Sequence, residues 1–350
     1  MSEEKMSLRP LTTAAFIVVT FIILALPFIP GMPSLPTIIP MITPHHFQEP
    51  SERFIIAFGD SYSRSGFRMN YTYTRTGPQM DDMERTDRPN DKLLDCPRAE
   101  NPIGNPQWPG KTSSGGQNWA MYMATEFNTT LTLAYIFARS GSVVDAEIIP
   151  PRRKSTFTFA HQIIHFKDSI GHRPHYAAWT AKNIVATIWF GLNDLSIAFN
   201  KKGRDDLLEA ANQRMFELSE ILYDTGIRSF IFIEIPPMEL FPSHQAKKLH
   251  DNNYKHEKVS YAINLWNSLL RQNTALFRQA HPDAKVTYVE IWDLFYQAFL
   301  HPESLGARNS TCVDPNGKDC LWANPGHPGE KIHQLIGARI AEKAWGSAVI

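Results

Sequence analysis

The sequence has few cysteines, no excess charge of either sign and no internal repeat. Its 350 residues include three cysteines, too few for a dense disulfide framework, so the chain must fold around a hydrophobic core. Lys and Arg total 35, as do Asp and Glu, which gives a formal net charge of zero. Without a basic excess, we expect no nucleic acid partner, because that binding depends on phosphate contacts. The 43% hydrophobic content excludes a wholly disordered chain.

Charged residues are also missing from a long stretch near the amino terminus. No Asp, Glu, Lys or Arg occurs in residues 11–48, and residues 14–26 are almost purely apolar. Lys5 and Arg9 precede this run, a pattern typical of a signal peptide or a signal anchor rather than a buried core helix. We therefore predict that residues 1–30 direct the rest of the chain into the secretory pathway.

Whether this segment is cleaved stays open at the level of the sequence. The apolar run approaches membrane-spanning length only if residues 11–29 act together across Pro27, and then they would anchor the protein in a membrane. Prolines are frequent just beyond it, and they predict a stiff linker at residues 31–50. The folded domain should then occupy residues 51–350, secreted or on the lumenal or extracellular side.

Two further features fit the secretory pathway. Three Asn-X-Ser/Thr sequences are glycosylation acceptors if exposed, at Asn70, Asn128 and Asn309. Cys312 and Cys320 are close enough in sequence to close a small loop in an oxidising compartment, which leaves Cys96 as a buried or free thiol.

Five short apolar runs predict strands that are buried on both faces of a sheet. They lie at residues 53–58, 131–137, 183–190, 228–235 and 285–291. Helical patterns occur at residues 119–126, 205–224, 255–280 and 330–343. Strands that alternate with helices indicate a doubly wound α/β sandwich, in which sites form at the carboxyl ends of the parallel strands.

Residues with catalytic potential follow these predicted strands. Ser61 ends a Gly-Asp-Ser sequence after the first strand, where it could be a nucleophile or merely a helix cap. Gly141, after the second strand, can offer its backbone N–H to an oxyanion. Asn193, after the third, can donate its amide to the same charge, or it can simply form a turn. His327 precedes the last helix and can act as a general base toward Ser61.

The order and setting of these four residues resemble the GDSL, or SGNH, hydrolase superfamily. The resemblance implies a three-layer α/β/α sandwich with a flavodoxin-like sheet of about five parallel strands. It implies ester hydrolysis through an acyl-serine intermediate, with no metal and no organic cofactor. Ser61 would be the nucleophile and His327 the base, while Ser61, Gly141 and Asn193 would form the oxyanion hole.

A narrower resemblance rests on residues 101–119, which read NPIGNPQWPGKTSSGGQNW. This segment is similar to one in fungal GDSL acetylesterases of the carbohydrate esterase family 16 type, and it implies acetylated carbohydrates or small esters as substrates. A general short-chain esterase or lipase is the alternative. Trp108 and Trp322 flank the predicted site in the sequence, so we expect them to stack on sugar rings.

One departure from the family pattern concerns the residue that orients His327. The family usually has Asp three residues before the histidine, whereas this chain has Asn324, which carries no charge. Asp314 or Asp319 could supply the carboxylate, or Asn324 with a backbone carbonyl could support a slower reaction. The chain could also be a weak relative that binds sugar without cleaving it. We expect weak-to-moderate catalysis, because the other four site residues are present.

Overall fold

The computed structural model describes most of the chain that follows the proline-rich segment: residues 50–68, 96–106, 108, 110–251 and 254–346. The predicted targeting segment at residues 1–30, the anchor at residues 11–29 and the glycosylation acceptor Asn70 lie outside the described residues. Within the described ranges, no helix is long and apolar enough to cross a membrane.

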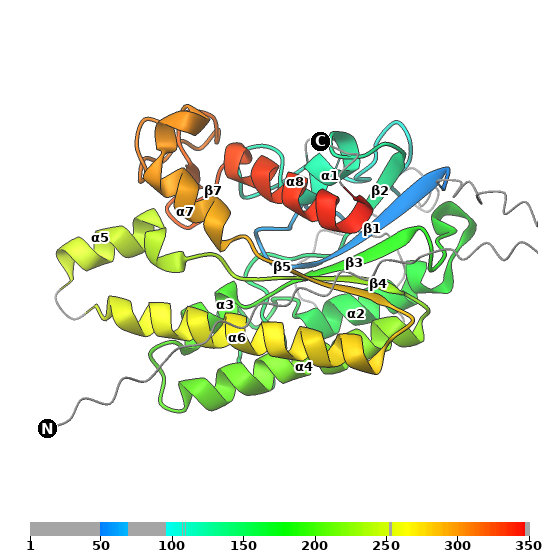
Figure 1. Ribbon diagram of the computed structural model, residues 1–350, viewed down its shortest axis with the longest axis horizontal. Coiled ribbons are helices and arrows are strands. Elements are labelled where there is room, and N and C mark those ends of the chain that lie inside the picture. Colours follow the sequence, from blue (N-terminus) through cyan, green and yellow to red (C-terminus); the bar gives the residue numbers. More distant parts are fainter. Residues whose placement is uncertain (1–49, 69–95, 107, 109, 252–253, 347–350) are drawn as a thin grey trace, which may run out of the picture. The chain divides into compact units, whose positions relative to one another are not determined.

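Five strands form one parallel sheet at the centre of the fold (Figure 1). They are β1 (Glu52–Gly59), β2 (Leu131–Ile136), β3 (Ile184–Trp189), β4 (Ser229–Ile233) and β5 (Lys285–Val289). Their order is β2-β1-β3-β4-β5, and every neighbouring pair is parallel. The predicted α/β sandwich with five parallel strands is confirmed, and each strand ends within two residues of its predicted bounds.

Helices cover both faces of this sheet, which explains why β1 and β3 are apolar along almost their whole length (Figure 1). One face carries α1 (Trp119–Thr125), α7 (Trp292–Leu300) and α8 (Glu330–Trp345). The other carries α2 (Phe159–Asp168), α3 (Leu192–Ala198), α4 (Arg204–Asp224) and α6 (His256–Ala280). A further helix, α5 (Pro242–His250), follows β4. The sequence patterns predicted α1, α4, α6 and α8 but not the other four.

The strand order creates the crevice in which ligands bind in such sheets. In the sheet, β2 lies on one side of β1 and β3 lies on the other. The strand order therefore reverses at β1, and a crevice is expected beyond the carboxyl end of this strand. Gly59 at the end of β1 pairs in register with Trp189 at the end of β3. The residues that follow these two strands therefore emerge side by side.

A short antiparallel pair completes the fold near the carboxyl terminus. It consists of β6 (Trp322–Asn324) and β7 (His327–Pro328), and Asn324 is paired with His327. The turn between them is fixed from both sides, because Ser243 donates its N–H to the Pro325 carbonyl at 3.0 Å and the Tyr62 hydroxyl donates to the Gly326 carbonyl at 2.8 Å. The hairpin thereby holds its histidine against the end of β1.

Candidate active site

Ser61 and His327 come together although 266 residues separate them in the chain. Ser61 lies two residues beyond the end of β1, and His327 begins β7. The Ser61 hydroxyl lies 2.8 Å from His327 Nε2, which is hydrogen-bonding distance. A neutral imidazole can accept the serine proton through this contact, which is the geometry required of a nucleophile and its base.

The other ring nitrogen of His327 faces Asn324. Its Nδ1 lies 2.7 Å from Asn324 Oδ1, and an amide oxygen only accepts, so Nδ1 carries the hydrogen and Nε2 is left to accept from Ser61. The amide is itself held in place. Its oxygen also accepts the Gly326 N–H at 3.1 Å, and its nitrogen donates to the Ser113 carbonyl at 3.3 Å.

Neither aspartate of the preceding loop takes over this orienting role. The Asp314 carboxylate accepts backbone N–H groups of its own loop, from Asn316, Lys318 and Asp319, and these bonds hold its pKa below the ordinary value. Across the ranges that the structure describes, no hydrogen bond joins His327 to a carboxylate. The orienting position therefore belongs to Asn324.

Burial of His327 favours the neutral ring that a base requires. Removal from water lowers the pKa of His327 to about 4, so the imidazole is uncharged at neutral pH. The aromatic ring of Tyr62 lies 5.4 Å from the imidazole, centroid to centroid. Among the described residues, the ring's hydrogen-bond partners are the neutral Asn324 amide and the Ser61 hydroxyl, so no hydrogen-bonded carboxylate would offset a positive charge on it.

Asn193, which follows β3, forms hydrogen bonds with the segments that follow β1 and β2. Its side-chain nitrogen donates to Asp60 Oδ2 at 2.9 Å and to the Ser142 carbonyl at 3.0 Å. The first acceptor adjoins Ser61, and the second adjoins Gly141, whose φ of +77° is in the left-handed region that favours glycine. The structure thus brings Asn193 close to Ser61 and to the Gly141 loop. Both amide hydrogens are engaged, so an oxyanion would have to share one of them.

Asp60 is buried and bonds on both of its oxygens. Oδ1 accepts the Tyr62 N–H at 2.9 Å, which holds the turn that carries Ser61, and Oδ2 accepts from Asn193. The pKa of Asp60 is raised to about 7, chiefly by burial and also by the nearby Asp194 carboxylate, while the hydrogen bonds from Tyr62 and Asn193 act to lower it. Asp60 therefore stabilises the turn that carries Ser61.

Two side chains that the sequence analysis did not select brace the same region. Gln162 of α2 donates to the Gly59 carbonyl at 2.8 Å and to Ser142 Oγ at 3.0 Å, and it accepts the Gly59 N–H at 3.0 Å. Asp194 of α3 accepts the Val144 N–H at 3.0 Å. Gln162 lies 103 residues from Gly59, and no local pattern marks it, so only the folded chain reveals the contact.

The two tryptophans that were expected to stack on sugars differ in their exposure to solvent. Trp108 is 37% exposed and accessible to a ligand. Trp322 is 1% exposed, its indole N–H donates to the Ser310 carbonyl at 2.8 Å, and its ring packs 5.1 Å from that of Phe241. The expectation for Trp322 was wrong, because the hydrophobic core encloses the side chain and leaves no face for a sugar.

Cys312 and Cys320 form a disulfide, with their Cα atoms 5.4 Å apart, in the loop that leads into β6. The third cysteine, Cys96, is buried. Of the other predicted glycosylation acceptors, Asn309 is exposed, whereas Asn128 is partly buried and donates its amide to the Met123 carbonyl at 3.1 Å.

Removal of this disulfide should lower stability measurably. The bond closes a loop with a sequence separation of 8, for which the loss of chain entropy in the unfolded state gives about 2–3 kcal/mol. We expect Cys312→Ser combined with Cys320→Ser to lower the free energy of unfolding by about this amount in denaturant titrations. An unchanged free energy would show that the loop contributes nothing to the cooperative fold.

A flavodoxin-like sheet with a serine just beyond its first strand, faced by a histidine from the segment before the last helix, is the arrangement expected of SGNH hydrolases. The model of the GDSL-like lipase/acylhydrolase family matches residues 55–340, and the chain belongs to this family. It is a carboxylic ester hydrolase.

The chain is similar to several known proteins. An acetylesterase of Thermothelomyces thermophilus is 34% identical over 295 residues, which cover 84% of this chain and 89% of the relative. A GDSL esterase/lipase of Arabidopsis thaliana is 29% identical over 154 residues, 39% of this chain and 41% of the relative. Among solved structures, the acetylxylan esterase Axe2 of Geobacillus stearothermophilus matches with a TM-score of 0.41 and 11% identity, over 85% of this chain and 96% of that one.

Proposed function

We propose that the protein is a serine esterase that removes acetyl groups from carbohydrates. The observation that carries the mechanism is the continuous line from Ser61 Oγ through the His327 ring to Asn324 Oδ1, with contacts of 2.8 and 2.7 Å. The preference for acetyl groups is supported by the similarity to the T. thermophilus acetylesterase over 84% of the chain.

In the first step of this mechanism, Ser61 Oγ attacks the carbonyl carbon of the ester and gives its proton to His327 Nε2. The charge that develops on the carbonyl oxygen is met by N–H donors around Ser61, with Gly141 and Asn193 as partners. His327 then returns the proton to the departing sugar oxygen as the carbon–oxygen bond breaks. In the second step, water attacks the acetyl-Ser61 ester, again through His327, and releases acetate.

Asn324 limits the rate of both steps in this scheme. It fixes the tautomer and the orientation of His327, but it offers no negative charge to the imidazolium that exists with each tetrahedral intermediate. The chain should therefore catalyse hydrolysis more slowly than an enzyme with a carboxylate at the same position.

Hydrolysis of p-nitrophenyl esters of increasing acyl length, together with acetate release from acetylated xylo-oligosaccharides, tests the proposal. We expect the acetyl ester to be cleaved fastest and the oligosaccharides to be deacetylated. Faster cleavage of long acyl chains would identify a lipase, and binding of the oligosaccharide without any turnover would identify a non-catalytic sugar-binding relative.

Replacement of Asn324 by Asp should raise kcat, by roughly tenfold or more, because a carboxylate would stabilise the charged His327. The gain is limited by the Ser113 carbonyl, which accepts a hydrogen bond from the Asn324 amide at 3.3 Å and would face a carboxylate oxygen instead.

The kcat/KM of the parent enzyme should rise as the pH passes about 4, where His327 becomes neutral, and then stay level. In Asn324→Asp the rise should move to higher pH, since an adjacent carboxylate raises the pKa of the imidazole.

The matched control for this change is Asp314→Asn. The Asp314 carboxylate bonds to backbone N–H groups of its own loop, so its loss should leave kcat and the pH profile unchanged. A sharp drop in kcat in Asp314→Asn, or a fall in Asn324→Asp, would contradict the orienting role given to Asn324.

We further infer that the enzyme acts in the secretory pathway or outside the cell. This inference is supported by the apolar segment within residues 1–30, by the acceptor sequences at Asn70, Asn128 and Asn309, and by the disulfide near the site. Recovery of the protein from the culture medium, with a loss of mass on removal of N-linked glycans, would test it. A protein found only in the cytosol would contradict it.

A further inference from the structure

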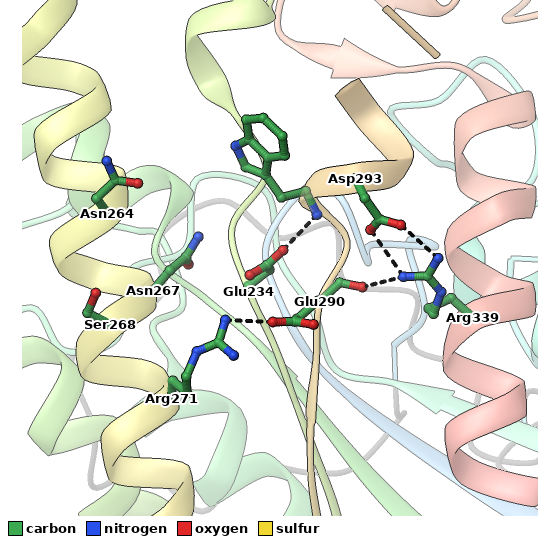
Figure 2. Close-up of a pocket in the computed structure, with 9 residues that line it drawn as sticks. Glu234, Asn264, Asn267, Ser268, Arg271, Glu290, Asp293 and Arg339 are labelled. Atoms are coloured by element: carbon green, nitrogen blue, oxygen red, sulfur yellow. Dashed lines mark hydrogen bonds and ion pairs between the residues drawn. The ribbon is translucent and has the colours of Figure 1, made fainter. Parts of the chain in front are cut away.

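A pocket of about 440 Å³ opens between α6, α7 and α8 (Figure 2). Two of the residues that line it directly follow strands, Glu234 after β4 and Glu290 after β5, so it lies at the carboxyl edge of the sheet. The described residues that line it include neither Ser61 nor His327. It is a concave site on the same edge of the sheet as the candidate active site.

The charges in this pocket are paired with one another. Arg339 donates to both carboxylate oxygens of Asp293, at 3.1 and 3.0 Å, and Arg271 donates to Glu290 at 2.6 Å (Figure 2). Glu234 adds a third carboxylate to these two guanidinium groups. The pocket therefore has no positive excess with which to hold an anionic ligand.

Trp292 lines the pocket, its backbone is held in place and its ring stacks on that of Tyr296. The buried carboxylate of Glu234 accepts the N–H of Ile291 at 2.8 Å and that of Trp292 at 2.6 Å, which anchors the start of α7. The Trp292 and Tyr296 rings are stacked, with centroids 4.7 Å apart and planes at 22°, yet the side chains are 38% and 37% exposed. This pair offers a rigid aromatic face to a ligand.

Neutral polar groups face the same space from α6. Asn264 and Ser268 lie four residues apart, about one helical turn, and both line the pocket (Figure 2). Among the residues that the structure describes, the side chains of Asn264 and Ser268 take part in no hydrogen bond, so both are open to a ligand. An aromatic face beside neutral donors and acceptors matches a sugar, whose C–H groups lie on rings while its hydroxyls form hydrogen bonds.

We propose that this pocket is an auxiliary binding site for a neutral oligosaccharide or polysaccharide, and this rests on the proposed carbohydrate deacetylase function. Trp292 supplies the stacking face, and Asn264 and Ser268 bind hydroxyls. Asn193 of the candidate active site follows β3. Neighbouring strands in a sheet are about 4.8 Å apart, so β4 and β5 lie roughly 5 and 10 Å to the side of β3. A glycan held in the pocket would extend along the edge toward Ser61 and raise the local concentration of its acetyl groups.

Affinity electrophoresis in native gels that contain soluble xylan tests the site without any need for turnover. We expect xylan to retard the protein, polygalacturonate to have little effect, and Trp292→Ala to weaken the retardation about tenfold. Ser61→Ala should be retarded like the parent protein. Leu300→Ala, an exposed position on the same helix outside the pocket, is the matched control and should behave like the parent.

Kinetics separate this inference from the proposed function. Trp292→Ala should raise KM for acetylated xylan and leave p-nitrophenyl acetate hydrolysis unchanged. Ser268→Tyr, which fills the pocket from an exposed position, should have the same effect if Trp292→Ala fails to fold. The auxiliary site is overturned if xylan does not retard the parent protein, or if it retards the parent and both variants equally. Either result overturns the site even when p-nitrophenyl acetate is hydrolysed. A dimer that Trp292→Ala converts to monomer overturns it in favour of a second copy as the occupant.

Discussion

Replacement of Ser61 by Ala is expected to reduce ester hydrolysis to background, a loss of roughly ten-thousandfold or more. The Ser61 hydroxyl is the atom beside His327 Nε2, at 2.8 Å, and alanine leaves no nucleophile for an acyl intermediate. The side chain is only partly buried, so the substitution should leave thermal unfolding close to that of the parent. Initial rates with p-nitrophenyl acetate and a melting curve on the same sample provide the measurement.

Ser63 is the matched control, since it lies in the same turn two residues further on. Its hydroxyl accepts the Trp119 indole N–H at 3.2 Å inside the core, and the side chain is buried. Ser63→Ala should therefore lower the melting temperature and keep most of the activity. A folded Ser61→Ala protein that still hydrolyses the ester, or a Ser63→Ala protein that does not, would contradict the choice of nucleophile.

The sheet was predictable from the sequence because each strand is a run of apolar residues bounded by polar turns. The burial of β1 and β3 on both faces makes such runs continuous, and their ends place Ser61 and Asn193 at one edge. The helices α2, α3, α5 and α7 were missed; each has at most ten residues and carries few periods of an apolar pattern, although α1, with seven residues, was predicted.

The contacts that hold the site could not be predicted in the same way. Gln162 braces Gly59 and Ser142 from a helix that was not predicted, and its role depends on geometry rather than on any motif. Trp322 had the right position in the sequence for a substrate contact, yet the short β6–β7 pair turns it into the core. Asn324 had the family's spacing to His327, and here the spacing was informative because a tight hairpin links the two residues.

Asn193→Ala is expected to lower kcat by about a hundred- to a thousandfold, because in the proposed mechanism its amide shares a hydrogen with the charge that develops on the substrate oxygen. The amide also bonds to Asp60 and to the Ser142 carbonyl, so its loss leaves two acceptors without this partner and loosens the end of β1 against the Gly141 loop. A donor that acts mainly in the transition state should affect kcat far more than KM.

A second asparagine in the fold separates a role in catalysis from a role in holding a strand end. Asn267 of α6 accepts the Ile235 N–H and donates to the Ile235 carbonyl, both at 3.0 Å, just beyond β4. Asn267→Ala should cost about 1–2 kcal/mol of stability and leave kcat for p-nitrophenyl acetate near that of the parent. If Asn193→Ala behaves in the same way, with reduced stability and an unchanged kcat, or if it raises only KM, then Asn193 serves as a structural tie. A large fall in kcat at constant KM assigns it to the oxyanion hole.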